Sequence, residues 1–149
     1  MSRKLGVIHT TPVTVDVFKA LAAELMPGCS VINFVDDSIL PELALPGTKV
    51  ESVQDKLVQY AKYAERAGAD VILSACSSVG EAASAMCSSV SVPVIRIDDA
   101  MATEAIRQGT KIGVAATLET TLRPTIELLQ QKARDTGCSR YYLAKLISS

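Results

Sequence analysis

Residues 68–81 read GADVILSACSSVGE, and the predicted fold follows from this stretch. Its apolar run is short and follows a glycine, which is typical of a buried strand. The run ends in Cys76. Ser78 and Glu81 then match a Ser-x-x-Glu capping box, in which the serine accepts from a backbone N–H and the glutamate reaches back. The stretch therefore predicts a strand, a cysteine at its carboxyl end and the start of a helix.

Cys76 can be interpreted in two ways. Just before a helix N-terminus, unpaired backbone N–H groups and the positive end of the macrodipole stabilise a thiolate and can hold a carboxylate nearby. A cysteine buried in apolar surroundings is instead inert and contributes only packing. The stretch alone leaves both interpretations open.

Strand and helix patterns alternate on both sides of this stretch. Helical patterns separate further short apolar segments, which predict strands at residues 4–10, 31–35, 93–97 and 111–117. This alternation predicts an α/β fold in which a parallel sheet has helices on both faces. Because crossover connections are right-handed, a flavodoxin-like strand order is the expected topology.

Three other segments are less regular. Val17, Leu21 and Leu25 recur at four-residue spacing and form an apolar stripe on the first predicted helix. Residues 36–47 contain Asp, Ser, Pro and Gly and predict a long loop. Residues 139–149 are compatible with either a strand or a helix.

Composition excludes several classes of function. The 15 basic and 16 acidic residues are interspersed, so neither nucleic-acid nor membrane-surface binding is expected. Apolar residues make up 48% of the chain, yet no apolar run approaches the roughly 18 residues of a membrane span. The N-terminal residues Met-Ser-Arg-Lys lead directly into a strand without a signal-peptide pattern, so a cytoplasmic location is expected.

The cysteines are too scattered for a zinc site or a disulfide framework, so reduced thiols and no metal are expected. Besides Cys76 they are Cys29, Cys87 and Cys138, which lie away from the predicted strand ends and are expected to pack. His9 is the only histidine, and it can be a neutral loop residue or a ligand contact.

Hydroxyl side chains follow the predicted strands. Ligands of open parallel sheets bind beyond the carboxyl ends of the strands. The residues at those ends are Thr10 and Thr11, then Cys76 with Ser77 and Ser78, and finally Thr117 with Thr120. Asp98 also follows a strand, but a helix cap is its expected role. Because no glycine-rich phosphate loop accompanies this set, a small carboxylate is the predicted ligand rather than a nucleotide.

Two stretches resemble the aspartate/glutamate racemase superfamily, which also contains hydantoin racemases, maleate isomerases and arylmalonate decarboxylases. Residues 69–78, ADVILSACSS, resemble the strand and turn that carry the first catalytic cysteine of that family. Residues 111–120, KIGVAATLET, resemble the strand that ends in a substrate-binding Ala-Thr-x-x-Thr. Residues 93–97 lie between them in the expected order, so the resemblance extends over nearly the whole chain as far as Gly137.

The resemblance implies racemisation or isomerisation without pyridoxal phosphate, metal or another cofactor. In such enzymes a thiolate from one lobe removes the proton alpha to a carboxylate, and a thiol from the other lobe protonates the opposite face. It implies that Cys76 is one acid/base, and that the contacts to the substrate are Thr10, Thr11, Ser77, Ser78, Thr117 and Thr120. A weakly acidic proton requires a base tuned near ambient pH and donors for the developing enolate charge.

The chain departs from the family pattern in two places. Ser77 and Ser78 stand where amino-acid racemases commonly have Asn-Thr, which leaves the substrate open. A second cysteine turn is not found, because Cys138 follows a predicted helix. The resemblance therefore implies that residues 1–97 form a first lobe with Cys76 and that residues 98–149 begin a second, incomplete lobe. The length of 149 residues is equally compatible with one compact flavodoxin-like domain over residues 1–149.

An incomplete second lobe would expose apolar surface, so a homo-oligomer that covers it is expected. Three functions remain open at this stage. The first is a racemase or isomerase acting on a small amino-acid-like carboxylate, and the second is a non-catalytic flavodoxin-like binding or interaction module. The third is a decarboxylase or lyase that uses a single cysteine. Whether the chain is an enzyme is therefore left open by its sequence.

Overall fold

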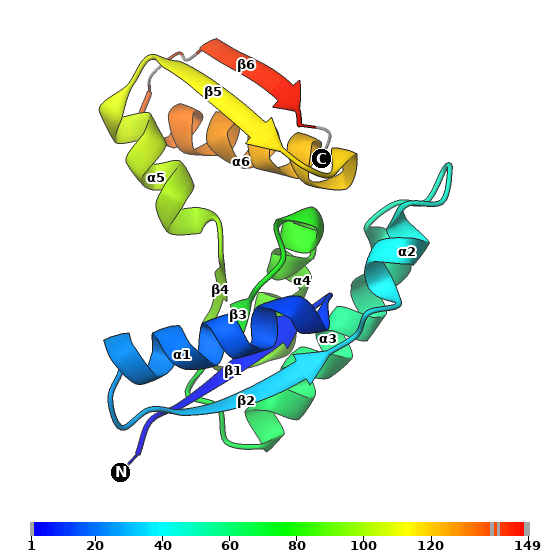
Figure 1. Ribbon diagram of the computed structural model, residues 1–149, viewed down its shortest axis with the longest axis vertical. Helices are drawn as coiled ribbons and strands as arrows, with labels where there is room; N and C mark the ends of the chain where they lie inside the picture. Colours follow the sequence, from blue (N-terminus) through cyan, green and yellow to red (C-terminus); the bar gives the residue numbers. More distant parts are fainter. Residues whose placement is uncertain (1, 138, 140, 148–149) are drawn as a thin grey trace. The chain divides into compact units, whose positions relative to one another are not determined.

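The computed structural model describes residues 2–137, 139 and 141–147 (Figure 1). The chain divides into two compact units, Met1–Arg96 and Ile97–Ser149. Strands and helices alternate through both units, which confirms the predicted α/β fold. Within these ranges, every helix is too short or too polar to cross a membrane.

The first unit is built on a four-stranded parallel sheet. Its strands are β1 (Lys4–His9), β2 (Ser30–Val35), β3 (Val71–Ser74) and β4 (Val94–Arg96), in the order β2-β1-β3-β4. In the register, Leu5 pairs with Val31 on one side and with Val71 on the other. This order matches the first four strands of the predicted flavodoxin-like topology. Because β1 and β3 are central neighbours, the residues that follow them meet at one edge of the sheet.

Helices lie on both faces of this sheet, as predicted. They are η1 (Pro12–Thr14), α1 (Val15–Leu25), α2 (Ile39–Leu43), α3 (Glu51–Arg66), η2 (Ser77–Ala82) and α4 (Ala83–Ser89). Ile8 and Ile72 belong to the buried cluster that contains Leu57 of α3. His9 points to the opposite face, because neighbouring strand residues alternate, and its ring meets Phe18 of α1 edge-on at 5.6 Å between centroids. The two helices α1 and α3 thus cover opposite faces (Figure 1).

A close approach between β1 and α3 depends on small residues. A Cβ atom placed on Gly6 would lie 2.9 Å from the Cβ of Ala64 and 3.3 Å from the Cβ of Ala69. Both alanines are buried. Glycine is therefore required at position 6 because strand and helix lie so close together. Its backbone conformation does not require glycine, since its φ angle is not positive.

The apolar stripe predicted on α1 faces outward. Val17, Leu21 and Leu25 are exposed, whereas Ala22 is buried and Phe18 is half-buried against the sheet. Successive residues of a helix are rotated by about 100°, so the apolar residues of α1 spread around more of the helix than the narrow strip that contacts the sheet. Periodicity identified an apolar helix face, but part of that face remains uncovered within the described residues.

The long loop predicted over residues 36–47 contains a short helix, so that prediction is wrong in part. In α2, Ile39 and Leu43 lie four residues apart and are buried in the first unit's core. Burial of these two side chains stabilises a helical turn that the Asp, Ser, Pro and Gly content of the segment did not predict.

A polar network fastens the segment after β2 to α3. The Tyr60 hydroxyl donates to Asp36 Oδ2 over 2.7 Å, and the backbone N–H of Ser38 donates to Asp36 Oδ1 over 3.0 Å. Lys56 of α3 pairs with Glu42 of α2 over 2.8 Å. Burial raises the pKa of Asp36, but the hydrogen bonds from Ser38 and Tyr60 outweigh it and hold that pKa below its ordinary value. The hydrogen bond to Asp36, together with burial, raises the pKa of Tyr60 to about 12.

We expect Tyr60→Phe to lower the free energy of unfolding by about 1 kcal/mol at pH 7, because it removes a hydrogen bond to a half-exposed carboxylate. A raised tyrosine pKa stabilises the fold below the unfolded value near 10, and this contribution is lost as pH rises toward about 12. The difference between the two proteins should therefore shrink between pH 10 and pH 12. Urea titrations at pH 7 and pH 11 measure this difference in the free energy of unfolding. An equal difference at both pH values would contradict the role given to the Tyr60 hydroxyl.

The second unit contains α5 (Asp99–Gln108), β5 (Lys111–Ala116), α6 (Glu119–Asp135) and β6 (Tyr141–Leu146). β5 and β6 form a two-stranded parallel sheet, so residues 141–146 of the ambiguous tail are a strand. Lys132 of α6 pairs with Asp99 of α5 over 2.8 Å. The buried core of this unit consists of Ala102, Ile106, Val114, Leu128, Leu129 and Ala133.

Candidate functional site

The carboxyl ends of β1 and β3 lie side by side. Ile8 pairs with Ser74, and the backbone N–H of Ala75 donates to the Ile8 carbonyl over 2.9 Å. Thr10 and Cys76 follow these paired ends. Cys76 is half-buried, has an extended backbone with φ −142° and ψ 117°, and packs against the core cluster that contains Ile72. This places a partly accessible thiol at the sheet edge where ligands of parallel α/β folds bind.

The turn after Cys76 differs from the predicted capping box. Cys76 itself occupies the N-cap position, and Ser78 is a buried residue inside the six-residue 3-10 helix η2. The α-helix α4 begins only at Ala83. Val79 and Ala82 are buried in the core, and Val79 has non-helical angles of φ −111° and ψ 17°. Burial of these two side chains sets the turn, so a short 3-10 helix precedes α4 where the start of a helix capped by Ser78 was predicted.

Arg96, the last residue of β4, lies against this turn. A Cβ atom on Gly80 of η2 would overlap the Arg96 guanidinium, so the glycine provides the space for the cation. Arg96 was predicted only as part of the strand at residues 93–97, so its place in the sequence did not indicate a site residue. A guanidinium at this edge contributes a fixed positive charge, and Glu81 of η2 places a carboxylate in the same turn.

His9 is held inside the first unit. It is fully buried; Nδ1 lies 2.8 Å from the Thr14 hydroxyl and Nε2 lies 2.8 Å from Asn33 Oδ1. A neutral ring that donates from Nε2 to Asn33 accepts from Thr14 at Nδ1. Of the two interpretations left open for His9, the arrangement fits a structural residue that fixes the start of α1. Thr11 also acts locally, because its hydroxyl accepts from the Val13 N–H over 3.4 Å at the start of η1.

Two hydroxyl groups at this edge are buried without a hydrogen-bond partner in the described part of the chain. They are Thr10 Oγ1 and Ser74 Oγ, on residues that are 2% and 1% exposed. An unpaired buried hydroxyl destabilises a fold by about 1–3 kcal/mol. Thr10 was a predicted site residue, and Ser74 was not. Ser74 is the last residue of β3, and nothing in the sequence indicated that its hydroxyl would be buried without a partner.

The predicted site residues fall into both units. Thr10, Thr11, Cys76, Ser77 and Ser78 come together at one edge of the first unit's sheet. In the second unit, Thr117 is exposed directly after β5, and Thr120 is the half-buried second residue of α6.

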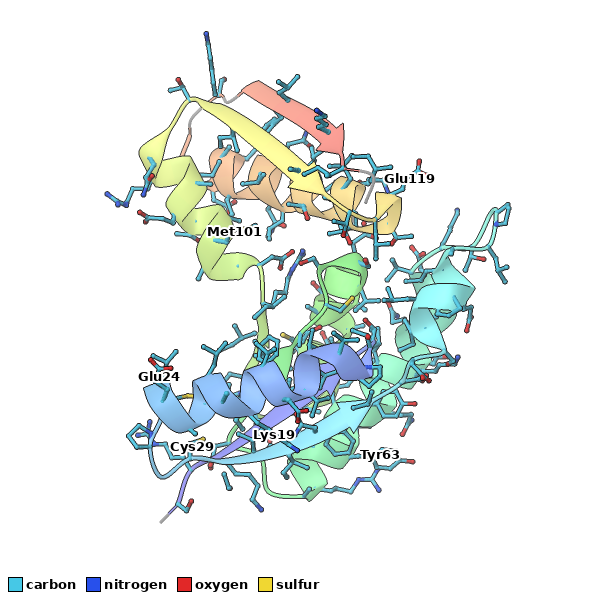
Figure 2. The ribbon with its side chains drawn as sticks, in the orientation of Figure 1. Lys19, Glu24, Cys29, Tyr63, Met101 and Glu119 are labelled. Carbon is cyan, nitrogen blue, oxygen red and sulfur yellow. The ribbon has the colours of Figure 1, made fainter. Side chains whose placement is uncertain are left out.

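The other described cysteines lie away from strand ends that could bind a ligand. Figure 2 shows Cys29 beyond the end of α1, and it directly precedes β2 at the opposite edge of the sheet. Cys87 is exposed on α4, and Cys138 is outside the described residues. Among residues 2–137, 139 and 141–147, Cys76 is therefore the one thiol that follows a strand. Metal-ligating side chains in the same ranges form no group of three or more.

Comparison with known proteins identifies related folds. The family model described as Asp/Glu/Hydantoin racemase matches residues 5–145. No curated protein matches the sequence. Glutamate racemase from Aquifex pyrophilus superposes with a TM-score of 0.72 at 20% identity, over 95% of this chain and 54% of that chain. An aspartate racemase homologue from Pyrococcus horikoshii OT3 gives 0.68 at 21% identity, over 97% and 65%.

A mutant of arylmalonate decarboxylase is also similar, with a TM-score of 0.59 at 15% identity over 97% of this chain and 62% of that chain. At such identities these structures establish a common fold. The chain spans 54% to 65% of the length of these three proteins.

Proposed function

Because the chain belongs to the Asp/Glu/hydantoin racemase family, we propose that it catalyses proton transfer at the carbon next to the carboxylate of a small amino-acid-like substrate, with Cys76 as acid/base. The family match confirms the resemblance noted for residues 69–78 and 111–120. The observation that carries the proposal is the position of Cys76, half-buried at the carboxyl end of β3 beside the end of β1.

In the proposed reaction, the Cys76 thiolate takes the proton from the α-carbon, and the electron pair of the broken C–H bond moves into the carboxylate as an enolate. Return of a proton to the same face restores the substrate with exchange of its hydrogen. A donor on the opposite face inverts the centre. Hydroxyl and backbone N–H donors aimed at the enolate oxygens lower the barrier, since negative charge develops there.

The proposed contacts to the substrate are hydroxyl residues at or just beyond the ends of strands. They are Thr10, Thr11, Ser77, Ser78, Thr117 and Thr120. Their positions after strands, together with the family resemblance, support this assignment.

We further propose that residues 1–97 form a first lobe with Cys76 and that residues 98–149 begin a second lobe. The separate sheets, β2-β1-β3-β4 and β5-β6, support this division over one compact domain. A homo-oligomer stays a prediction, which size-exclusion chromatography with light scattering tests. A strictly monomeric profile would contradict it.

The proposed function is tested by exchange of the α-proton in deuterated buffer. We expect the proton NMR signal of the α-hydrogen to disappear for at least one of L-aspartate, L-glutamate and a 5-substituted hydantoin. The exchange is expected without added pyridoxal phosphate and in the presence of a metal chelator. If none of the three exchanges while ligand binding is detected, and phenylmalonate is not decarboxylated, the non-catalytic binding module is the better account.

A single-cysteine decarboxylase is the second candidate. It is favoured by the fold similarity to arylmalonate decarboxylase and by Cys76 being the one thiol after a strand in the described ranges. In this reaction the C–C bond to the departing carbon dioxide breaks, its electron pair stays as an enolate, and the Cys76 thiol protonates that carbon. Phenylmalonate would then release carbon dioxide, whereas the three racemase substrates would show no exchange.

A further inference from the structure

Thr10 and Ser74 each bury a hydroxyl group for which the fold of the described residues provides no hydrogen-bond partner. Most buried polar groups in proteins are paired, so an unpaired one requires an explanation. Here two such groups occur at the carboxyl ends of the two central strands. An internal water is one possible partner, and a polar group of a ligand is the other.

Ser74 points to the α3 face of the sheet, because it pairs with Ile8 of the core cluster, and Thr10 directly follows the end of the neighbouring strand β1. Ile8 and Ile72 share the core cluster on the α3 face, and Thr10 and Ser74 follow them by two residues. The packing of Cys76 against the same cluster places the thiol on this face as well. Neighbouring strands lie about 4.8 Å apart, and residues two apart in a strand are separated by about 6.6 Å. One small group can therefore reach both hydroxyls and remain next to Cys76.

A cation and a carboxylate, Arg96 and Glu81, both lie in or against the turn after Cys76. Arg96 lies against Gly80 in the turn that follows Cys76, and its guanidinium carries a permanent positive charge. Two hydroxyl donors and a nearby cation match the acceptor oxygens of a carboxylate.

We propose that Thr10 and Ser74 form a hydroxyl pair that binds the carboxylate of the substrate beside Cys76. This inference rests on the proposed function, and it adds Ser74 as a binding residue. It also explains why the two groups are unpaired, since their partner arrives with the ligand. The two unpaired hydroxyl groups would then lower the stability of the free protein and raise its affinity for the carboxylate, a trade-off that is common at functional sites.

The test replaces each hydroxyl by a similar apolar group, in Thr10→Val and Ser74→Ala. Without ligand, we expect each variant to raise the midpoint of thermal unfolding by about 2–4 °C, because an unpaired buried hydroxyl is removed. With ligand, we expect the Kd to rise about tenfold to a hundredfold, since hydrogen bonds to a charged group are lost. The probes are L-aspartate, L-glutamate and malonate, and calorimetric titration measures their binding.

Two further variants serve as controls. Thr10→Ser keeps a hydroxyl at the same position and should retain most of the affinity. Ser89→Ala removes a half-buried α4 hydroxyl that is already paired with the Ala85 carbonyl over 2.7 Å, and its Kd should equal that of the unchanged protein.

If the pair holds only an internal water, both apolar variants lose thermal stability and keep the original Kd, which overturns the inference. An unchanged protein that binds none of the three carboxylates would overturn it too. Failure of the proposed function gives a different result. Carboxylates would still bind, and Ser74→Ala would still weaken that binding, but no α-proton would exchange.

Discussion

Replacing Cys76 with serine is expected to slow exchange of the substrate α-proton by at least about a hundredfold. Positioned acid–base groups contribute roughly 10²- to 10⁴-fold, and a serine hydroxyl is not ionised near neutral pH as a thiol can be. The substitution is nearly isosteric and Cys76 is half-buried, so the fold should persist. Proton NMR in deuterated buffer measures the rate, and circular dichroism verifies the fold.

The matched controls for this prediction are Cys29→Ser and Cys87→Ser. Both thiols lie away from the carboxyl ends of β1 and β3, so exchange should keep its original rate in each variant. Alkylation with iodoacetamide adds a second measurement. An activated Cys76 should react faster than a free thiol near neutral pH. Exchange that survives in Cys76→Ser would rule out the thiol as the acid/base.

Replacing Gly6 with valine is expected to destabilise the protein by about 3 kcal/mol, the upper part of the usual range for overpacked cores. A Cβ atom alone would already lie 2.9 Å from the Ala64 Cβ, and valine adds two methyl groups. The Cβ atoms of Ala64 and Ala69 cannot rotate out of the way, so α3 must move away from β1. Urea unfolding followed by circular dichroism measures the loss.

The control is Gly113→Val, in strand β5. A Cβ atom on Gly113 would have no atom within 4 Å, and β-branched residues favour strands. This variant should therefore unfold at the same or a higher urea concentration than the original protein. Equal midpoints for the two valine variants would show that the spacing between β1 and α3 does not require glycine.

The parallel sheet could be predicted because buried strands leave a local signal. Residues 71–73 are apolar between a glycine and a polar turn, and the segments at 4–10, 93–97 and 111–117 repeat that pattern. The position of Cys76 after a strand followed directly. The helix start predicted at Ser78 was wrong, because the burial of Val79 and Ala82 outweighs the local capping preference. That burial depends on residues distant in sequence.

The candidate site was predictable to a similar extent. The residues predicted for the site follow strands, and five of them come together at one sheet edge; their role in binding stays a prediction. Ser74 and Arg96, which we propose as part of this site, gave no sequence signal for a physical reason. Ser74 is a candidate only because its hydroxyl is buried and unpaired. Arg96 is a candidate only because its guanidinium lies against Gly80. Both properties arise from neighbours in the folded chain.

The contact between Gly80 and Arg96 also constrains how this site can change during evolution. The missing side chain at position 80 and the guanidinium at position 96 occupy one shared volume. A larger residue at 80 therefore favours a shorter one at 96, and the two positions should covary among related sequences. In a double-mutant cycle their effects should be non-additive. The geometry of the turn after Cys76 and the charge at the sheet edge would then be inherited together.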